Sequence, residues 1–328
     1  MNSQVRRLLQ RPEAGAAAGL LLTWSILAVI AGPSFRSAAG TAAWLNAAAP
    51  LGILAVAVAL LMIGGEFDLS VGSTLGAAGM LLMLLIAHYG WPLWAGVIAT
   101  LAFCALVGLA NGLLVVRTGL PSFIVTLGSL FVLRGATIGV SRAVTGRTQL
   151  GGLDASPGYP LARWLFAGEP IAGLRSSIFW WLAMAAFATW VLQRTRAGNW
   201  IFATGASGEA ARNSGVPVAR VRVALFVATA LAAGSVAIIQ AVRFNGADAL
   251  RGEFQEFRAI VAAVIGGTLL TGGYGTIIGA CCGALVFGIV QQGIVMAGID
   301  ADWFQVALGA LLVLAVISNN ALLARAQR

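Results

Sequence analysis

Residues 51–87 decide the fold, and they read LGILAVAVALLMIGGEFDLSVGSTLGAAGMLLMLLIA. Apolar residues fill this stretch except at its centre, where Gly64 and Gly65 precede the carboxylates of Glu66 and Asp68. About 20 apolar residues cross a bilayer as a helix, so the stretch is long enough for two spans. Glycine weakens a helix, and a carboxylate at membrane depth is costly unless it faces a cavity or a partner. The stretch predicts a broken helix beside a solute path, or else a plain cytoplasmic turn with solvated acids.

The composition extends this prediction to the whole chain. Of the 328 residues, 59% are hydrophobic and 9% are charged, against about 25% charged residues in average soluble proteins. A soluble globule of this size could not cover its surface with so few polar groups. The composition therefore excludes an ordinary soluble enzyme and predicts an all-α, polytopic membrane protein.

Ten apolar runs are candidate membrane spans. They lie at about 14–31, 44–63, 71–87, 93–116, 121–141, 177–193, 223–242, 259–271, 276–297 and 303–318. The run at 259–271 is short for a full crossing, so a re-entrant or broken helix is expected there. We predict eight to ten spans, with ten preferred, in one transmembrane domain over residues 1–328.

Arginine placement predicts the orientation, because cytoplasmic loops carry an excess of basic residues. With ten spans and a cytoplasmic N-terminus, eleven arginines lie in inner loops and eight in outer loops. The densest arginine block, within residues 194–222, is expected in the cytoplasm. This orientation also places segments 1–13 and 319–328 in the cytoplasm and makes 142–176 an outer loop.

The residue types that are missing restrict the chemistry. All twenty basic residues are arginine, and a phosphate-binding P-loop requires a lysine, so the chain cannot carry that ATPase motif. The single histidine, His88, excludes a multi-histidine metal centre. The net charge of +9 comes from arginines scattered between spans, which disfavours nucleic acid as a partner. We expect no catalytic residue, metal or cofactor in this chain.

A second polar motif lies in the 194–222 loop. Ser207 is a plausible N-cap, and Glu209 falls in the first helical turn, where the helix dipole favours a negative charge. Gly215 suits the left-handed position after a helix, and Pro217 blocks continuation. The motif predicts a short surface helix of about two turns, which is either a docking element or a structural connector.

Two further local features are expected near the helix breaks. Ser70 or Ser73 could cap the helix that follows the first break by accepting a hydrogen bond from its free N–H groups. The sequence Ile63-Gly64-Gly65 recurs as Ile265-Gly266-Gly267. Transporters often contain internal repeats with broken helices at matching positions, although glycine-rich apolar sequence also produces such matches by chance.

Four blocks of sequence occur in the order found in a known family. They are residues 68–72 (DLSVG), 121–128 (PSFIVTLG) with 133–135 (LRG), 209–215 (EAARNSG), and 259–268 (AIVAAVIGGT) with 272–275 (GGYG). The block at 209–215 resembles the EAA loop of bacterial ABC importer permeases, which seats in the ATPase subunit. The other three resemble signatures of ribose-type sugar permeases. Together the blocks cover about residues 50–320.

The resemblance implies the membrane subunit of a binding-protein-dependent ABC importer that carries a monosaccharide or related small polyol across a bacterial inner membrane. It implies a permease homodimer or heterodimer, cytoplasmic ATPase subunits that hold ATP and Mg, and a periplasmic solute-binding protein received by loops 142–176 and 243–258. The residues implied to couple to the ATPase are Glu209, Ala210, Ala211 and Gly215.

The same resemblance suggests which residues form the path and its breaks. The candidate pathway residues are Glu66, Asp68, Ser70, Phe123, Thr126, Arg134 and Glu256, and the candidate helix breaks are Gly64, Gly65, Gly72, Gly266, Gly267, Gly272 and Gly273. Two positions depart from the family pattern: Glu66 replaces a glycine, and Arg258 stands where an acid is usual. Both departures bear on which solute is carried.

Arg134 lies about 14 residues into its predicted span, roughly 20 Å from the inner end at 1.5 Å per residue. Its guanidinium could snorkel toward the lipid headgroups, or it could face a cavity and bind a sugar hydroxyl or a carboxylate. We expect a pair with Asp68 only if segment 64–72 dips deeply into the membrane. The alternative class for the whole chain is a secondary transporter or channel driven by an ion gradient, for which Glu66 and Asp68 are the obvious titratable pair.

Overall fold

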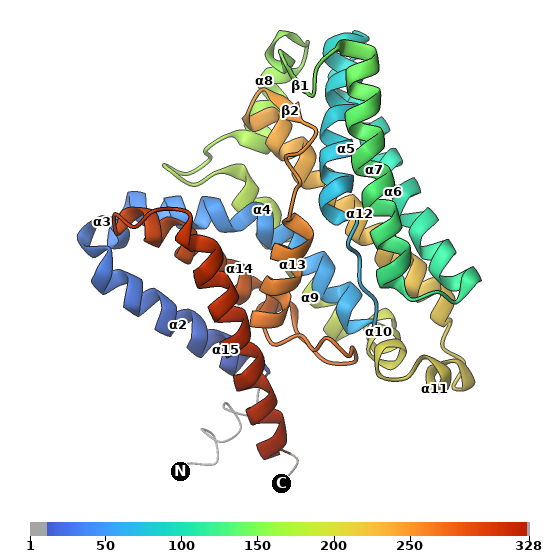
Figure 1. Ribbon diagram of the computed structural model, residues 1–328, viewed down its shortest axis with the longest axis vertical. Coiled ribbons are helices and arrows are strands. Elements are labelled where there is room, and N and C mark those ends of the chain that lie inside the picture. The colour runs from blue at the N-terminus through green and yellow to red at the C-terminus, as the bar shows by residue number, and fades with distance from the viewer. Residues whose placement is uncertain (1–11, 327–328) are drawn as a thin grey trace.

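The computed structural model describes residues 12–326, which form a bundle of helices (Figure 1). The longer helices are α2 (Pro12–Ile30), α4 (Ala38–Ile63), α5 (Val71–Met83, extended by a π-helical turn Leu84–His88), α6 (Leu93–Thr118), α7 (Ser122–Thr145), α9 (Ser176–Arg194), α12 (Val218–Arg243), α14 (Ile277–Met296) and α15 (Trp303–Ala326). The shorter ones are α3 (Gly32–Arg36), α8 (Tyr159–Ala162), α10 (Arg196–Ala206), α11 (Gly208–Asn213) and α13 (Gln255–Ile265), with a 3-10 turn Leu153–Ala155 and a π-helical turn Arg163–Ala167.

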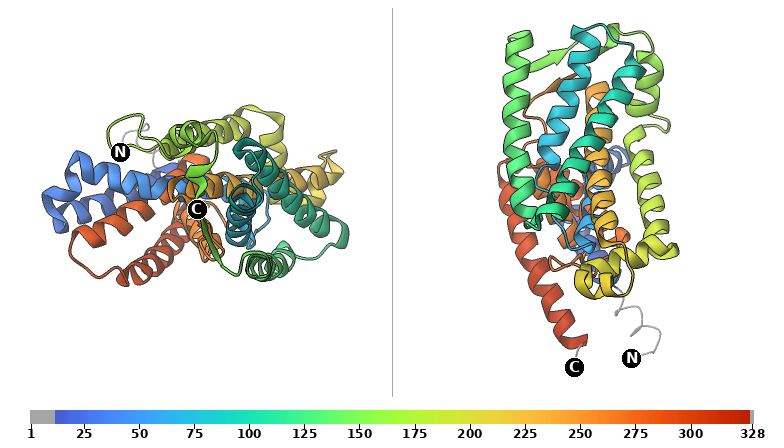
Figure 2. Two further views of the ribbon diagram at one scale, coloured as in Figure 1. Left: turned by 90° about the horizontal axis from the view of Figure 1, so that it is seen from above. Right: turned by 90° about the vertical axis from the view of Figure 1, so that its right-hand side faces the viewer.

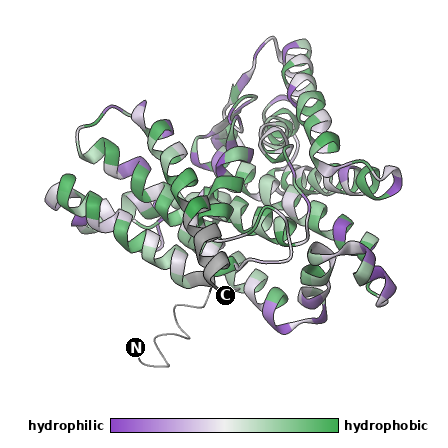
Figure 3. Ribbon diagram, turned by 60° about the horizontal axis from the view of Figure 1, so that its bottom comes forward, coloured by the Kyte–Doolittle hydropathy of each residue, from purple (hydrophilic) through white to green (hydrophobic). Residues whose placement is uncertain are grey.

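The helices confirm an all-α polytopic membrane protein. Within residues 12–326, seven helices are long and apolar enough to cross a membrane, and Ala14–Ile30 and Trp303–Leu314 are shorter apolar helices. The eleven-residue α13 occupies the run that is too short to cross. Figure 3 shows apolar residues along most helices, with hydrophilic residues mainly at loops and helix ends. The expected segment 1–13 lies almost wholly outside the described residues.

The molecule has two distinct ends along the bundle. At one end, β1 (Gln149–Gly151) pairs antiparallel with β2 (Gly246–Asp248), with Leu150 opposite Ala247. This ribbon joins the two loops that were expected to lie outside. Helix α11 lies at the opposite end, where α2 begins and α15 ends (Figures 1 and 2).

The first predicted break is present. Helix α4 ends at Ile63, Gly64 occupies its C-cap, and Gly65 adopts φ 83°, a left-handed conformation that favours glycine. The chain then runs without helix to Ser70 before α5 begins. Glu66 and Asp68 in this segment are buried, only 6% and 2% exposed. The alternative of a plain turn with solvated acids is therefore wrong.

The end of α13 repeats this turn. Gly266 is the C-cap, Gly267 has φ 88°, and the Thr268 N–H donates to the Ala263 carbonyl. At the first break the Glu66 N–H donates to the Leu61 carbonyl in the same 6→1 pattern, that of a Schellman turn. The recurring Ile-Gly-Gly sequence thus encodes the same backbone turn twice.

Between β2 and α13 the chain runs beside the first turns of α5. A Cβ on Gly252 would collide with the Gly72 carbonyl oxygen, and one on Gly76 would lie 2.7 Å from the Ala249 oxygen. Small residues at such crossings let backbones approach closely, which is how helices pack in lipid. The resemblance suggests a helix break at Gly72. In the structure Gly72 instead lies within α5, where it is a point of close backbone contact.

Gly252→Ala should destabilise the protein, because the added methyl overpacks the contact with α5 at a cost of about 1–3 kcal/mol. The measurement is the thermal unfolding midpoint of the purified full chain in detergent. Gly128→Ala on α7 is the matched control, because nothing lies within 4 Å of a Cβ there. Equal midpoints for the two variants would contradict the close approach.

Candidate functional site

The non-helical segment before α5 is held by side chains at the start of α7. The Phe67 N–H donates to Ser122 Oγ and the Leu69 N–H donates to Thr126 Oγ1, each at 3.0 Å. Backbone inside a membrane needs internal hydrogen-bond partners, because lipid offers none. Hydroxyl groups of the 121–128 block therefore accept the hydrogen bonds that the backbone around the 68–72 block donates.

A polar network continues from this segment to α6. Asp68 Oδ1 accepts from the Ser70 N–H at 2.8 Å and from Ser70 Oγ at 2.6 Å. Asn111 Nδ2 donates to Ser70 Oγ at 2.9 Å, and Ser129 Oγ donates to Asn111 Oδ1. Ser70 occupies the N-cap of α5 but its side chain makes no cap hydrogen bond, and Ser73 lies inside the helix, so the expected side-chain cap by either serine is wrong. Asp68 binds the Ser70 backbone N–H instead.

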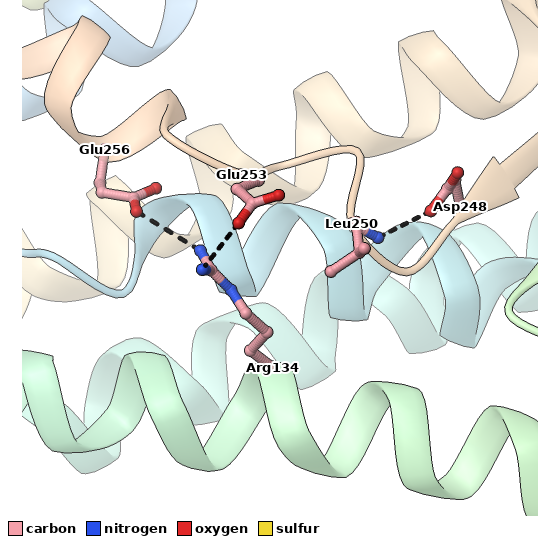
Figure 4. Close-up of polar contacts among 5 residues, drawn as sticks. All are labelled: Arg134, Asp248, Leu250, Glu253 and Glu256. Atoms are coloured by element: carbon pink, nitrogen blue, oxygen red, sulfur yellow. Dashed lines mark hydrogen bonds and ion pairs between the residues drawn. The ribbon is translucent and has the colours of Figure 1, made fainter.

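Arg134 is the centre of a second polar cluster, shown in Figure 4. Its Nη1 lies 3.5 Å from Glu253 Oε1 and its Nη2 lies 3.5 Å from Glu256 Oε1. Glu256 is in the first turn of α13, where the helix dipole favours a carboxylate. Arg134 therefore pairs with acids beside the second broken helix, whereas Asp68 is engaged with Ser70.

The Arg134 cluster lies near the middle of α7 and is partly exposed. Arg134 is midway along α7, and the side chains of Arg134 and Glu253 are 23% and 41% exposed. Figures 1 and 2 show α13 and the preceding segment on a face between α7 and α15. Partly exposed charges at mid-membrane depth do not face hydrocarbon. This face must therefore meet water or protein.

The short helix at 208–213 has the local structure that the sequence predicted. Ser207 Oγ accepts from the Ala210 N–H at 3.3 Å, Glu209 is in the first turn, and Gly215 has φ 83°. Ala211 is buried against the bundle. The other side of α11 is solvent-exposed, so it remains accessible at its end of the molecule.

An ion pair connects this region to the first break. Arg222, in the second turn of α12, places Nε 2.8 Å from Glu66 Oε1, and the side chain of Glu66 is only 8% exposed. The Arg222 guanidinium also lies next to Gly208, where α11 begins. Arg222, on the helix that follows α11, thus connects the Glu66 carboxylate to the start of α11.

Three backbones meet at the same end. A Cβ on Gly272 would lie 2.7 Å from Gly65 Cα and 2.9 Å from the Gly205 oxygen. The Gly273 N–H donates to the Ile63 carbonyl at 2.8 Å. The turn after α4 therefore contacts the 272–273 loop that follows α13, and both lie against Gly205 in the last turn of α10, just before α11.

Among the candidate pathway residues, Phe123 is 53% exposed, whereas Asp68, Ser70, Thr126 and Glu256 are buried between elements. The site also includes residues that were not expected from the sequence, namely Asn111, Ser122, Ser129, Arg222 and Glu253. Asn111 could have been predicted from the sequence, because an amide side chain inside an apolar span needs a hydrogen-bond partner within the protein.

Interrupted helices with polar groups at their breaks, within a domain of apolar spans, are the architecture of a membrane transport permease. The chain belongs to the family described as "Branched-chain amino acid transport system / permease component", whose model matches residues 40–316.

Several curated relatives are named "Autoinducer 2 import system permease protein LsrD". The one from Photorhabdus laumondii is 32% identical over 270 residues, which cover 82% of this chain and 80% of the relative. Those from Salmonella typhimurium and Escherichia coli O9:H4 are 31% and 33% identical, each covering 84% of this chain and 82% of the relative. No solved structure matches the chain. These similarities confirm the predicted class, an ABC importer permease.

Thr126→Val should destabilise the protein, because it keeps the shape but leaves the buried Leu69 N–H without an acceptor, at about 1–3 kcal/mol. Thr137→Val on the same helix is the control, since Thr137 Oγ1 bonds only to the Leu133 carbonyl one turn earlier. The measurement compares the thermal unfolding midpoints of the two variants in detergent. A Thr126→Val midpoint no lower than that of Thr137→Val would contradict the anchoring role.

Glu66→Gln should be more harmful alone than together with Arg222→Gln, because the single change leaves a cation without its partner. Contacting residues typically show non-additive effects of about 0.5–3 kcal/mol. The unfolding midpoints of both single variants and the double variant give this value. Additive effects would show that the ion pair contributes nothing to stability.

Proposed function

We propose that this chain forms half of the translocation pathway of a binding-protein-dependent ABC importer for a sugar-type solute. A second permease subunit, a copy or a sibling, forms the other half. ATP and Mg are held by separate ATPase subunits at the α11 end. Under this proposal the α11 end and both termini are cytoplasmic, in a bacterial inner membrane.

The observation that carries the proposal is the charged face between α7 and α15. Its cluster of Arg134, Glu253 and Glu256 is at mid-depth and partly open. The same face exposes the apolar side chains of Leu250 and Phe257. A facing permease subunit would cover the apolar part and leave a water-filled path along the charged part. The cluster then offers both donors and acceptors to the hydroxyl groups of a passing solute.

The coupling route follows from the contacts at the α11 end. An ATPase that moves α11 would act on the Gly65–Gly205–Gly272 contact and on the Glu66–Arg222 pair. Both lead directly into the segments that precede α5 and follow α13. Movement at α11 would therefore shift the two broken helices together and change access to the path between them.

At the opposite end, the loops 142–176 and 243–258 would receive the solute-binding protein. The ribbon of β1 and β2 joins these loops into one surface. The sugar-type cargo is supported by the signature blocks and by relatives that are named for the import of autoinducer 2. Recognition of the cargo would belong mainly to the binding protein, so few permease residues need to bind it tightly.

Glu209→Arg should abolish ATP-driven uptake while leaving membrane insertion intact, because it reverses the charge on the helix that would seat in the ATPase. Uptake into proteoliposomes that contain the complete complex, with ATP inside, is the measurement. Glu209→Asp keeps the carboxylate and is the control. Normal uptake by Glu209→Arg would remove α11 from the coupling mechanism.

Uptake should also require the ATPase subunit. In proteoliposomes with the permease alone, an imposed proton gradient should drive no solute accumulation. Accumulation that persists without the ATPase and collapses with the gradient would instead establish the ion-driven secondary transporter.

A further inference from the structure

A cavity of about 230 Å³ lies between α4, α12, α13 and α14. It is separate from the Arg134 cluster, although α13 contributes to both. Glu256 and Arg258 are two residues apart on α13, and residues at that spacing lie on different faces of a helix. Glu256 is directed at Arg134, and Arg258 lines the cavity.

The polar wall of this cavity is made of cations and amides. It includes Arg243, Arg258, Gln240, Gln255, Gln291 and Gln292, and no lining residue is acidic. In the described part of the chain, no carboxylate lies within ion-pair distance of Arg243 or Arg258. The Arg243 guanidinium instead stacks on the Phe244 ring, 4.9 Å from its centroid. Glu256 attracts Arg258 electrostatically but forms its ion pair with Arg134, so the lining of the cavity carries net positive charge.

The amides of the wall add unused hydrogen-bonding capacity. Gln240 Oε1 is buried and has no hydrogen-bond partner within residues 12–326. Buried polar groups are normally satisfied, and those that are not point to an occupant. Arginine and glutamine side chains together donate to anionic oxygens, and the glutamine oxygens accept from hydroxyl groups.

The cavity has a route toward the end away from α11. Arg258, Gln291 and Gln292 also line a second cavity of about 520 Å³ that reaches Asp302 in the loop between α14 and α15. A solute that arrives at the end opposite to α11 could therefore reach Arg258 without crossing the apolar core.

We propose that the cavity around Arg243 and Arg258 binds the anionic group of a small hydroxylated molecule, such as a sugar acid or a sugar phosphate. A volume of about 230 Å³ holds roughly eight waters at about 30 Å³ each, enough for one such group and its neighbouring hydroxyls. The same chemistry is offered by an anionic lipid headgroup. That the bound anion is the cargo rests on the proposed function, whereas the binding itself does not.

The experiment measures binding of gluconate to the full chain in phosphatidylcholine nanodiscs, by calorimetry. Gluconate should bind saturably, and neutral sorbitol should bind at least about tenfold more weakly, since charge-assisted hydrogen bonds are about twice as strong as neutral ones. Arg258→Gln and Arg243→Gln should each weaken gluconate binding about tenfold or more. Arg258→Lys should retain part of it, and Arg142→Gln, at an exposed arginine of α7, should leave it unchanged.

Nanodiscs of phosphatidylglycerol distinguish the two sources of the anion. Unchanged gluconate binding there assigns the cavity to a soluble anion. Loss of gluconate binding, together with phosphatidylglycerol retention that Arg258→Gln abolishes, assigns it to a headgroup and overturns the cargo assignment. Absence of saturable anion binding in both lipids, or binding that Arg258→Gln leaves intact, overturns the site.

These readouts need neither ATP nor the ATPase subunit. A failure of the import proposal would appear as absent ATP-driven uptake with gluconate binding intact. A failure of the anion site would appear as absent gluconate binding, whatever the result of the uptake measurement.

Discussion

Non-helical backbone at membrane depth must find every hydrogen-bond partner inside the protein, and the arrangement of this chain follows from that constraint. Between α4 and α5 the peptide N–H groups of Phe67 and Leu69 are satisfied by hydroxyls of α7. Asp68 and Asn111 complete the network from within the break and from α6. Helices α6 and α7 are thus fixed around the break, because moving either one would expose unsatisfied polar groups to lipid.

The interruption before α13 is held in place by different contacts. Segment 249–254 lies against α5 through glycine contacts, and Arg134 from α7 pairs with its Glu253 and with Glu256 in the first turn of α13. Helix α7 therefore supports both interruptions, with hydroxyls at its start and a cation at its middle. At the other end Gly65, in the turn after α4, contacts Gly272 in the loop after α13, and both contact Gly205 near the end of α10. Both interruptions are therefore held by α7 on one side and by the last turn of α10 on the other.

The sequence predicted the features that are determined locally. The paired glycines at 64–65 and 266–267 end α4 and α13, and a serine before Gly208 with a glycine at 215 specifies a short capped helix. The partners of the polar residues could not be predicted in the same way. Arg134 and Glu253 are 119 positions apart, and nothing in a single sequence states which distant charges meet. The same holds for Glu66, whose ion-pair partner Arg222 lies in a different helix far along the chain.

The ribbon of β1 and β2 has a mechanical consequence. Only four residues separate Asp248, at the end of β2, from Glu253 in the charged cluster. Those four residues form hydrogen-bonded turns, in which the Arg251 N–H donates to the Asp248 carbonyl, and they pack against α5 at Gly252, so they make a short, compact link. A protein that tilts the ribbon by docking on it would displace this short link directly. Under the proposed function, the arrival of a loaded binding partner would then shift the charged cluster at mid-membrane before any nucleotide is hydrolysed.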